Sequence, residues 1–287
     1  MLMDHIGEFF PDSPIWFQWL GRLAAPLFFY ALAVGFQHTR NRKKYLLRLY
    51  LANVGMVFFN QIMCMLQRKL DYVAYQPKNH NIFTTLFCAG VLICIWESRK
   101  EKKKFFTYIG IYIFWQAMVM GLAILAEAFD YVWRGNALLQ TVLRTNYIFP
   151  LLGGIWDAEG GVFFIVLGIW LYCAVEKKGK LALHYILFCG AYMFMCQGDI
   201  LYRIMSRFSF WGYHKLADVI YFGSSFVGIP LGTSDLSLLT EFYQWMMIGA
   251  LPIMLACNGK RGKNLKWLFY AAYPLQFLVL YGISYYK

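Results

Sequence analysis

The chain has 287 residues, of which 60% are hydrophobic and 15% charged, and its formal net charge is +12. Soluble domains average about 45–50% apolar and about 25% charged residues, so this composition excludes a water-soluble enzyme and a disordered chain. The basic residues form short clusters between apolar runs, which excludes a basic nucleic-acid-binding stripe. We therefore expect an all-α polytopic bundle in a lipid bilayer, with residues 1–287 forming one membrane domain.

The apolar runs predict about eight membrane-spanning helices. Such a helix needs about 20 mainly apolar residues. The stretches that approach this length are, in chain order, Ile15–Gln37, Tyr45–Leu66, Asn81–Trp96, Phe105–Ala126, Gly161–Val175, Leu181–Tyr202, Glu241–Cys257 and Leu265–Tyr286. Two more apolar stretches, 137–155 and 216–232, are interrupted by glycine and proline, so the sequence leaves open whether they cross and allows up to about ten helices.

The basic clusters orient these segments. With eight crossings, the loops HTRNRKK, ESRKEKKK, EKKGK and CNGKRGKNLK all fall on one side of the membrane. Cytoplasmic loops collect Lys and Arg, so that side is the predicted cytoplasmic face of the plasma (inner) membrane. The first residues of the chain are then expected outside, together with most of the acidic residues.

Cysteine and histidine give no metal-binding signature. The chain has seven cysteines, most of them inside apolar runs, and it has no C-x-x-C pair or histidine at ligand spacing. A packing role for these thiols is expected, and no metal ion.

Two polar groups near the predicted outer surface are candidate reaction residues. Arg22 lies within the first span, and it either reaches the interface and pairs with an acid such as Glu8 or faces the bundle interior and steadies an anionic group. His5 has Asp4 beside it in MDHIGEFFP, and it is either an interfacial hydrogen-bonding residue or a proton acceptor. Neighbouring helical residues point about 100° apart, so a third group is needed to hold the His5 ring.

The basic segment at 38–48 is a cytoplasmic anchor and also a candidate site for phosphates or anionic lipid head groups. Its polar members are His38, Arg40, Asn41, Arg42, Lys43, Lys44 and Arg48. The segment NGKRGK, with Lys260 and Arg261, offers the same two interpretations, but it lacks the rest of a phosphate-binding P-loop. Within the spans, Asn53 and Asn81 are expected to bond between helices, and Asp199 to pair with Arg203.

Four motifs resemble the TraX family of conjugal-transfer pilin acetylation proteins. They are DHIGEFFP, GRLAAPLFFYALAVGFQHTRNRKKYLLRL, NIFTTLF and CNGKRGKNLKWLFYAAYPLQFLVLY, and they occur in the family order. The family is similar to multi-spanning acyltransferases that use acyl-CoA. In place of a histidine that is common in the last family motif this chain has Gln276, which forms hydrogen bonds but does not titrate.

The resemblance implies an integral-membrane acetyltransferase with acetyl-CoA as donor. Under this hypothesis acetyl-CoA binds from the cytoplasm through the basic segment at 38–48 and through Lys260 and Arg261. Arg40, in that segment, is expected about 27 Å from Arg22 along one helix. His5 is the general base or is itself transiently acetylated, Asp4 lies beside it, and Arg22, Asn53 or Asn81 stabilises the oxyanion. The acceptor, a protein such as pilin, a glycan or a small amine, stays open. The alternatives are a transporter or lipid-handling scaffold, and a structural subunit of a secretion or pilus assembly.

Overall fold

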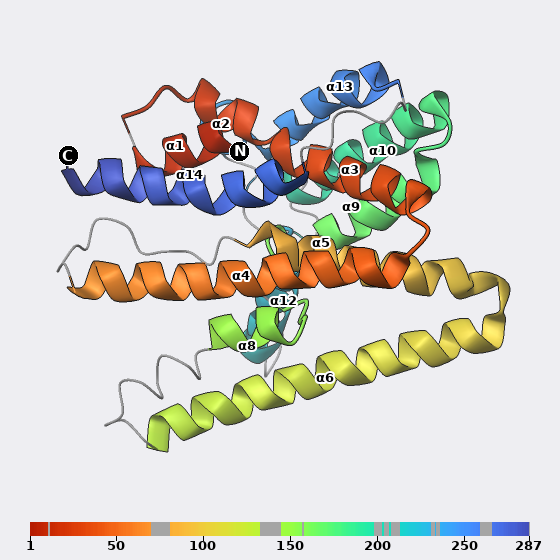
Figure 1. Cartoon of the computed structure of the whole chain (residues 1–287), viewed down its shortest axis with the longest axis horizontal. Coiled ribbons are helices and arrows are strands. Elements are labelled where there is room, and N and C mark those ends of the chain that lie inside the picture. Colours follow the sequence, from red (N-terminus) through yellow and green to blue (C-terminus); the bar gives the residue numbers. More distant parts are fainter. Residues whose placement is uncertain are drawn as a thin grey trace.

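The computed structural model consists of helices joined by turns and loops, with no strand among the residues it describes (Figure 1). Those residues are 1–10, 12–69, 81–132, 145–156, 158–197, 203, 207, 213–230, 233, 236–258 and 266–286. By length and composition, five helical stretches can cross a membrane, and they are Trp16–His38, Arg42–Leu66, Ile82–Lys100, Lys102–Ala126 and Lys178–Gln197. The prediction of an all-α membrane bundle is confirmed.

The first predicted span is divided by a break beside Arg22. Helix α1 (Leu2–Phe9) precedes it, and the span itself consists of α2 (Trp16–Gly21) and α3 (Ala24–His38). Pro26 has no N–H to donate to the carbonyl of Arg22, which explains why the regular helix is interrupted there. Helix α1 packs against α2 and against the last helix, α14 (Lys266–Tyr286).

Helix α5 (Ile82–Glu97) lies at the centre of the bundle. It is the most buried of the five long stretches, and it packs against α3, α4 (Arg42–Lys69), α6 (Lys102–Val132) and α9 (Gly161–Ala174). A short 3₁₀ turn, η1 (Ser98–Lys100), joins α5 to α6. The sequence of α5 is apolar on every side, which suits a helix that is surrounded by other helices.

Two predicted spans are shorter in the structure than a full crossing requires. One is α9, and the other, predicted as Glu241–Cys257, consists of the 3₁₀ helix η2 (Gln244–Gly249) followed by α13 (Ala250–Ala256). Helix α10 (Lys178–Gln197) holds the second of them, because the buried Tyr185 hydroxyl donates to the carbonyl of Met247 at 2.6 Å. The number of crossings, eight, therefore stays a prediction.

The two interrupted stretches overlap α8 (Thr145–Leu151) and α12 (Tyr213–Val227). Helix α8 is about 10 Å long, too short to cross, and residues 137–144 lie outside the described part. Irregular backbone follows it, and side chains of α4 and α6 donate to carbonyls of the last turn of α8 and of this backbone. The pairs are Asn53 to Pro150 (2.6 Å), Tyr50 to Leu151 (2.8 Å), Trp115 to Leu152 (2.9 Å) and Gln116 to Gly153 (3.1 Å). Irregular backbone at membrane depth needs such partners.

Candidate functional site

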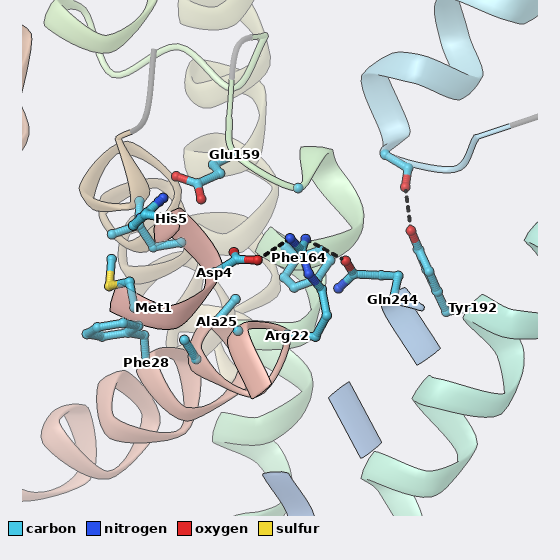
Figure 2. A pocket seen from close by; sticks show the side chains of 15 residues that line it. Met1, Asp4, His5, Arg22, Ala25, Phe28, Glu159, Phe164, Tyr192 and Gln244 are labelled. Carbon is cyan, nitrogen blue, oxygen red and sulfur yellow. Dashed lines mark hydrogen bonds and ion pairs between the residues drawn. The ribbon is translucent and has the colours of Figure 1, made fainter. Parts of the chain in front are cut away.

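A cavity of about 140 Å³ opens where the start of the chain meets α3, α9 and η2 (Figure 2). Its polar lining includes all three residues that the sequence predicted to be catalytic. The lining residues used below are Asp4, His5, Gly21, Arg22, Glu159, Gly160, Tyr192, Gly228 and Gln244. Because these come from separate segments of the chain, the cavity exists only in the assembled bundle.

Arg22 is held by two polar partners and one aromatic ring. It donates to the Asp4 carboxylate in an ion pair and, through Nη1, to Gln244 Oε1 at 3.1 Å. Its guanidinium carbon lies 5.4 Å from the centre of the Tyr243 ring. Figure 2 shows the guanidinium between the Asp4 carboxylate and the Gln244 amide. The sequence proposed Glu8 as a possible partner of Arg22, and the structure places Asp4 there instead.

A glycine explains why Asp4 reaches Arg22. A Cβ atom on Gly21 would overlap the side chain of Asp4, so only glycine at this position lets α1 lie against the end of α2. Arg22 follows Gly21 directly, at the break before α3. The ion pair therefore ties the break to α1.

His5 is almost completely buried, with 3% of its surface exposed. Its Nδ1 atom lies 3.6 Å from a carboxylate oxygen of Glu8, one turn further along α1. The ring centre of Phe277, in α14, lies 4.4 Å from that of His5. Glu8 and Phe277 are thus two of the groups that lie against the imidazole. A histidine with a carboxylate beside its ring is an arrangement that suits proton transfer.

Glu159 comes to the cavity from the loop before α9. The hydroxyl of Thr85, in α5, donates to the backbone carbonyl of Glu159 at 3.2 Å. In Figure 2 the Glu159 carboxylate and the His5 ring lie on the same side of the cavity. Two ionisable side chains from distant parts of the chain therefore face one small space.

The loop that carries Glu159 crosses the end of α12 at glycines. Gly160, Gly161 and Gly228 have φ values of +77°, +67° and +87°. A Cβ atom on Gly161 would lie 2.6 Å from the nitrogen of Gly228, and one on Gly228 would overlap the carbonyl of Gly160. Tyr192, in α10, donates to the carbonyl of Gly228 at 3.4 Å. Any other residue type would strain this crossing and move Glu159.

The predicted donor site at 38–48 lies at the other end of α3 (Figure 1). His38, Arg40, Asn41, Lys43, Lys44 and Arg48 are exposed. Asn41 also caps α4, because its side-chain oxygen accepts from the N–H of Lys44 at 2.9 Å.

Arg42 differs from its neighbours because it pairs within the bundle. Its Nη2 atom lies 3.0 Å from Glu97 Oε1, which also accepts from the Tyr172 hydroxyl, and its guanidinium carbon lies 5.4 Å from the centre of the Phe36 ring. These contacts tie the start of α4 to α5, α9 and α3.

Other predicted residues lie away from the cavity lining. Asn53 is fully buried, and its amide nitrogen donates to the carbonyl of Pro150. Its side-chain oxygen accepts from Asn81 and from Thr84, each at 2.7 Å. The interhelical role expected for these amides is confirmed. Two predicted donor-site residues, Lys260 and Arg261, lie outside the described residues. Asp199 lies outside them too, so its expected pair with Arg203 stays a prediction.

No group of three or more His, Cys, Asp or Glu side chains in the described ranges is arranged to hold a metal ion.

Sequence reasoning did not identify Glu159, Tyr192 and Gln244 as members of the site. Each is separated from His5 by more than a hundred residues, and none lies in a recognisable motif. For Glu159 the available signal was the adjacent glycine pair in DAEGG, which is typical of a tight backbone crossing.

The sequence model of a known family, described as TraX protein, matches residues 1–195 of the chain. The match includes His5, Arg22 and Glu159, whereas Gly228 and Gln244 lie beyond it. Comparisons with curated proteins and with solved structures find no match.

Proposed function

The chain belongs to the TraX family, and from that premise we propose that it is an integral-membrane acetyltransferase of the inner (plasma) membrane. It transfers an acetyl group from cytoplasmic acetyl-CoA to an amine or hydroxyl acceptor outside, for which the N-terminus of a pilin is the family example. The cavity that brings His5 together with Arg22, Asp4 and Glu159 is the observation that carries the proposal. A lipid-facing helix bundle has no structural need for a buried histidine beside three charged groups.

The proposed reaction needs one proton acceptor and one oxyanion partner. His5 removes a proton from the acceptor while the acceptor nitrogen or oxygen attacks the acetyl carbonyl carbon. The C–S bond then breaks, and the imidazolium returns the proton to the departing thiolate, which leaves as free CoA. In the covalent variant the His5 ring is acetylated first and passes the acetyl group on.

The neighbours of His5 have distinct parts in this scheme. Glu8 fixes the ring and stabilises the imidazolium, because its carboxylate lies beside Nδ1. Arg22 supplies the positive charge for the oxyanion, and Asp4 and Gln244 hold its guanidinium in place. Asn53 and Asn81 are less suited to the oxyanion role, because their amide groups donate to other parts of the bundle.

The donor is proposed to bind at the basic end of α3. Arg40, Lys43, Lys44 and Arg48 are exposed there, which suits phosphate groups that stay in contact with water. Lys260 and Arg261 are proposed to contribute from the opposite end of the sequence. The pantetheine arm then spans the distance to the cavity between the helices.

Thermal unfolding with three ligands tests the proposal. Detergent-purified protein is heated with acetyl-CoA, CoA or dephospho-CoA, and thiol release from acetyl-CoA is measured in parallel. A ligand at about 100 times its Kd stabilises a fold by about 2.7 kcal/mol. We expect stabilisation by acetyl-CoA, a smaller effect with dephospho-CoA, and release of free thiol. Absence of any shift in folded protein contradicts the acetyltransferase proposal, and binding without thiol release favours a transporter.

A further inference from the structure

The side chains around the cavity favour a positively charged occupant. Among the described lining residues, Asp4 and Glu159 are acidic and Arg22 is basic, and Asp4 and Arg22 form an ion pair. Met1 also lines the cavity, and burial lowers the pKa of its α-amino group and so favours the uncharged form of that group. With that amino group and His5 neutral, the lining carries a formal charge of one negative unit. In surroundings of low dielectric constant, such a charge attracts a cation strongly.

The hydrogen-bonding groups near His5 favour an occupant with several N–H groups. A neutral imidazole has one nitrogen that accepts, and an ionised carboxylate has about four acceptor positions. Glu159 therefore has room for a substrate hydrogen bond alongside the contacts it makes within the protein. A primary ammonium offers three N–H groups, so it can bond to both residues at once, whereas a hydroxyl offers one O–H group.

The backbone that carries Glu159 is held on both sides. The hydroxyl of Thr85 donates to the backbone carbonyl of Glu159. The two glycines that follow Glu159 form the crossing with Gly228. On the N-terminal side, the Gln116 amide bonds to two backbone groups. It donates to the carbonyl of Gly153 and accepts from the N–H of Ile155 at 3.0 Å. Rigid support of this kind is what a substrate-contacting side chain requires.

We propose that Glu159 is a further catalytic residue, which binds the nitrogen of the acceptor beside His5 and gives the site its preference for amines over hydroxyls. The inference rests on the proposed acetyl transfer. The acceptor enters as R–NH₃⁺ and passes one proton to His5. The neutral amine attacks, the C–N bond forms and the C–S bond breaks. His5 releases the first proton to water before the attack, then takes the second N–H proton and returns it to the departing CoA thiolate.

The first test measures binding and does not depend on turnover. Trialanine amide, which has a free amine, is compared with its lactyl analogue, in which a hydroxyl replaces that amine, by ligand-dependent thermal unfolding. The variants are Glu159→Gln and, as a matched control, Glu101→Gln, whose side chain is exposed and pairs with Lys104 at the start of α6. We expect the wild type and the control to bind the amine, and the Kd to rise at least tenfold in Glu159→Gln. An equal Kd in both variants, or no binding to the wild type, overturns the proposal.

The second test measures thiol release with the same variants. We expect Glu159→Gln to raise the KM for trialanine amide at least tenfold and to leave the KM for acetyl-CoA unchanged. It should also reduce the preference for the amine over the lactyl analogue. If the wild type is active and Glu159→Gln has an unchanged KM for trialanine amide, the role of Glu159 is overturned and the acetyltransferase proposal stands. Amine binding that depends on Glu159, without thiol release from any variant, overturns the acetyltransferase and leaves Glu159 as an amine-binding residue.

Discussion

The two ends of α3 use charge in different ways. At its N-terminal end Arg22 and Asp4 form an ion pair that lines a cavity, and His5 is buried beside Glu8. At its C-terminal end the side chains from His38 to Arg48 are mostly exposed, and among the described residues Arg42 is the basic residue of this segment that pairs with an acid, Glu97. Each end contains one arginine with an aromatic contact and a carboxylate partner. The arginine at the N-terminal end, Arg22, also lines the cavity.

The difference teaches where the sequence imposes a specific geometry. A charge in an apolar bundle is costly unless it is paired, so the polar groups at the cavity end need defined partners. Exposed basic residues at the membrane surface cost little and adapt to any anion. We therefore expect substitutions at the cavity end to abolish activity or stability, and substitutions at the basic end to act gradually.

The largest expected effect is at His5. Replacement by Gln keeps hydrogen bonding but removes the proton acceptor, so thiol release should fall by about 10²- to 10⁴-fold. The thermal unfolding of the variant should stay close to that of the wild type, because the size of the side chain is nearly retained. Full turnover in His5→Gln would show that the two ends do not differ in catalytic importance.

The next effect is expected at the ion pair of the cavity end. Arg22→Met leaves the Asp4 carboxylate without its cation, which should lower the free energy of unfolding by about 1–3 kcal/mol. The double variant with Asp4→Asn removes both charges and should recover part of that loss. Urea or thermal unfolding of the two single variants and the double variant measures the coupling; strictly additive effects would argue against a coupled pair.

The corresponding pair at the basic end should matter less. Arg42→Met removes the cation beside Glu97, but the Glu97 carboxylate keeps the hydrogen bond from the Tyr172 hydroxyl, which compensates part of the loss. We expect a decrease of about 1 kcal/mol in the free energy of unfolding. Lys43→Met is the matched control, with a change within about 0.5 kcal/mol. A larger loss for Arg42→Met than for Arg22→Met would reverse the comparison.

The smallest effect is expected for the exposed lysines. Lys43→Gln and Lys44→Gln should each raise the Kd for acetyl-CoA about two- to fivefold. This change corresponds to a loss of about 0.5–1 kcal/mol in binding free energy, the contribution of one exposed ion pair. Salt screens such contacts, so the difference from the wild type should shrink between low and high ionic strength. Binding titrations at two salt concentrations check both statements. An affinity that does not change with either the substitutions or salt would place the phosphates elsewhere.

Much of the fold was predictable because the bilayer imposes a length on apolar helices. The predicted ranges at Tyr45–Leu66, Asn81–Trp96 and Phe105–Ala126 correspond to α4, α5 and α6. The break between α2 and α3 was not predicted, since it depends on the missing N–H of Pro26 within one long, mainly apolar run. The short α8 is held because side chains of α4 and α6 donate to carbonyls of its last turn and of the backbone that follows, which no local pattern reveals.

The site was predictable in part for the same reason. His5 and Arg22 are polar residues in apolar surroundings, so their positions alone marked them as unusual. Their partners were harder to predict, because Asp4 meets Arg22 only where Gly21 allows α1 to approach. Glu159 and Gln244 looked like ordinary loop and interface residues until the bundle brought them to the cavity.

The sequence by itself determined the helical membrane character of this protein, because composition and apolar run length act locally and depend on no distant contact. Its motifs also determined its family. The tertiary structure decided which charges meet. Hydrogen bonds and ion pairs are effective only over a few ångströms, so the grouping of Asp4, His5, Arg22 and Glu159 depends on how α1, α3 and the glycine crossing before α9 pack together.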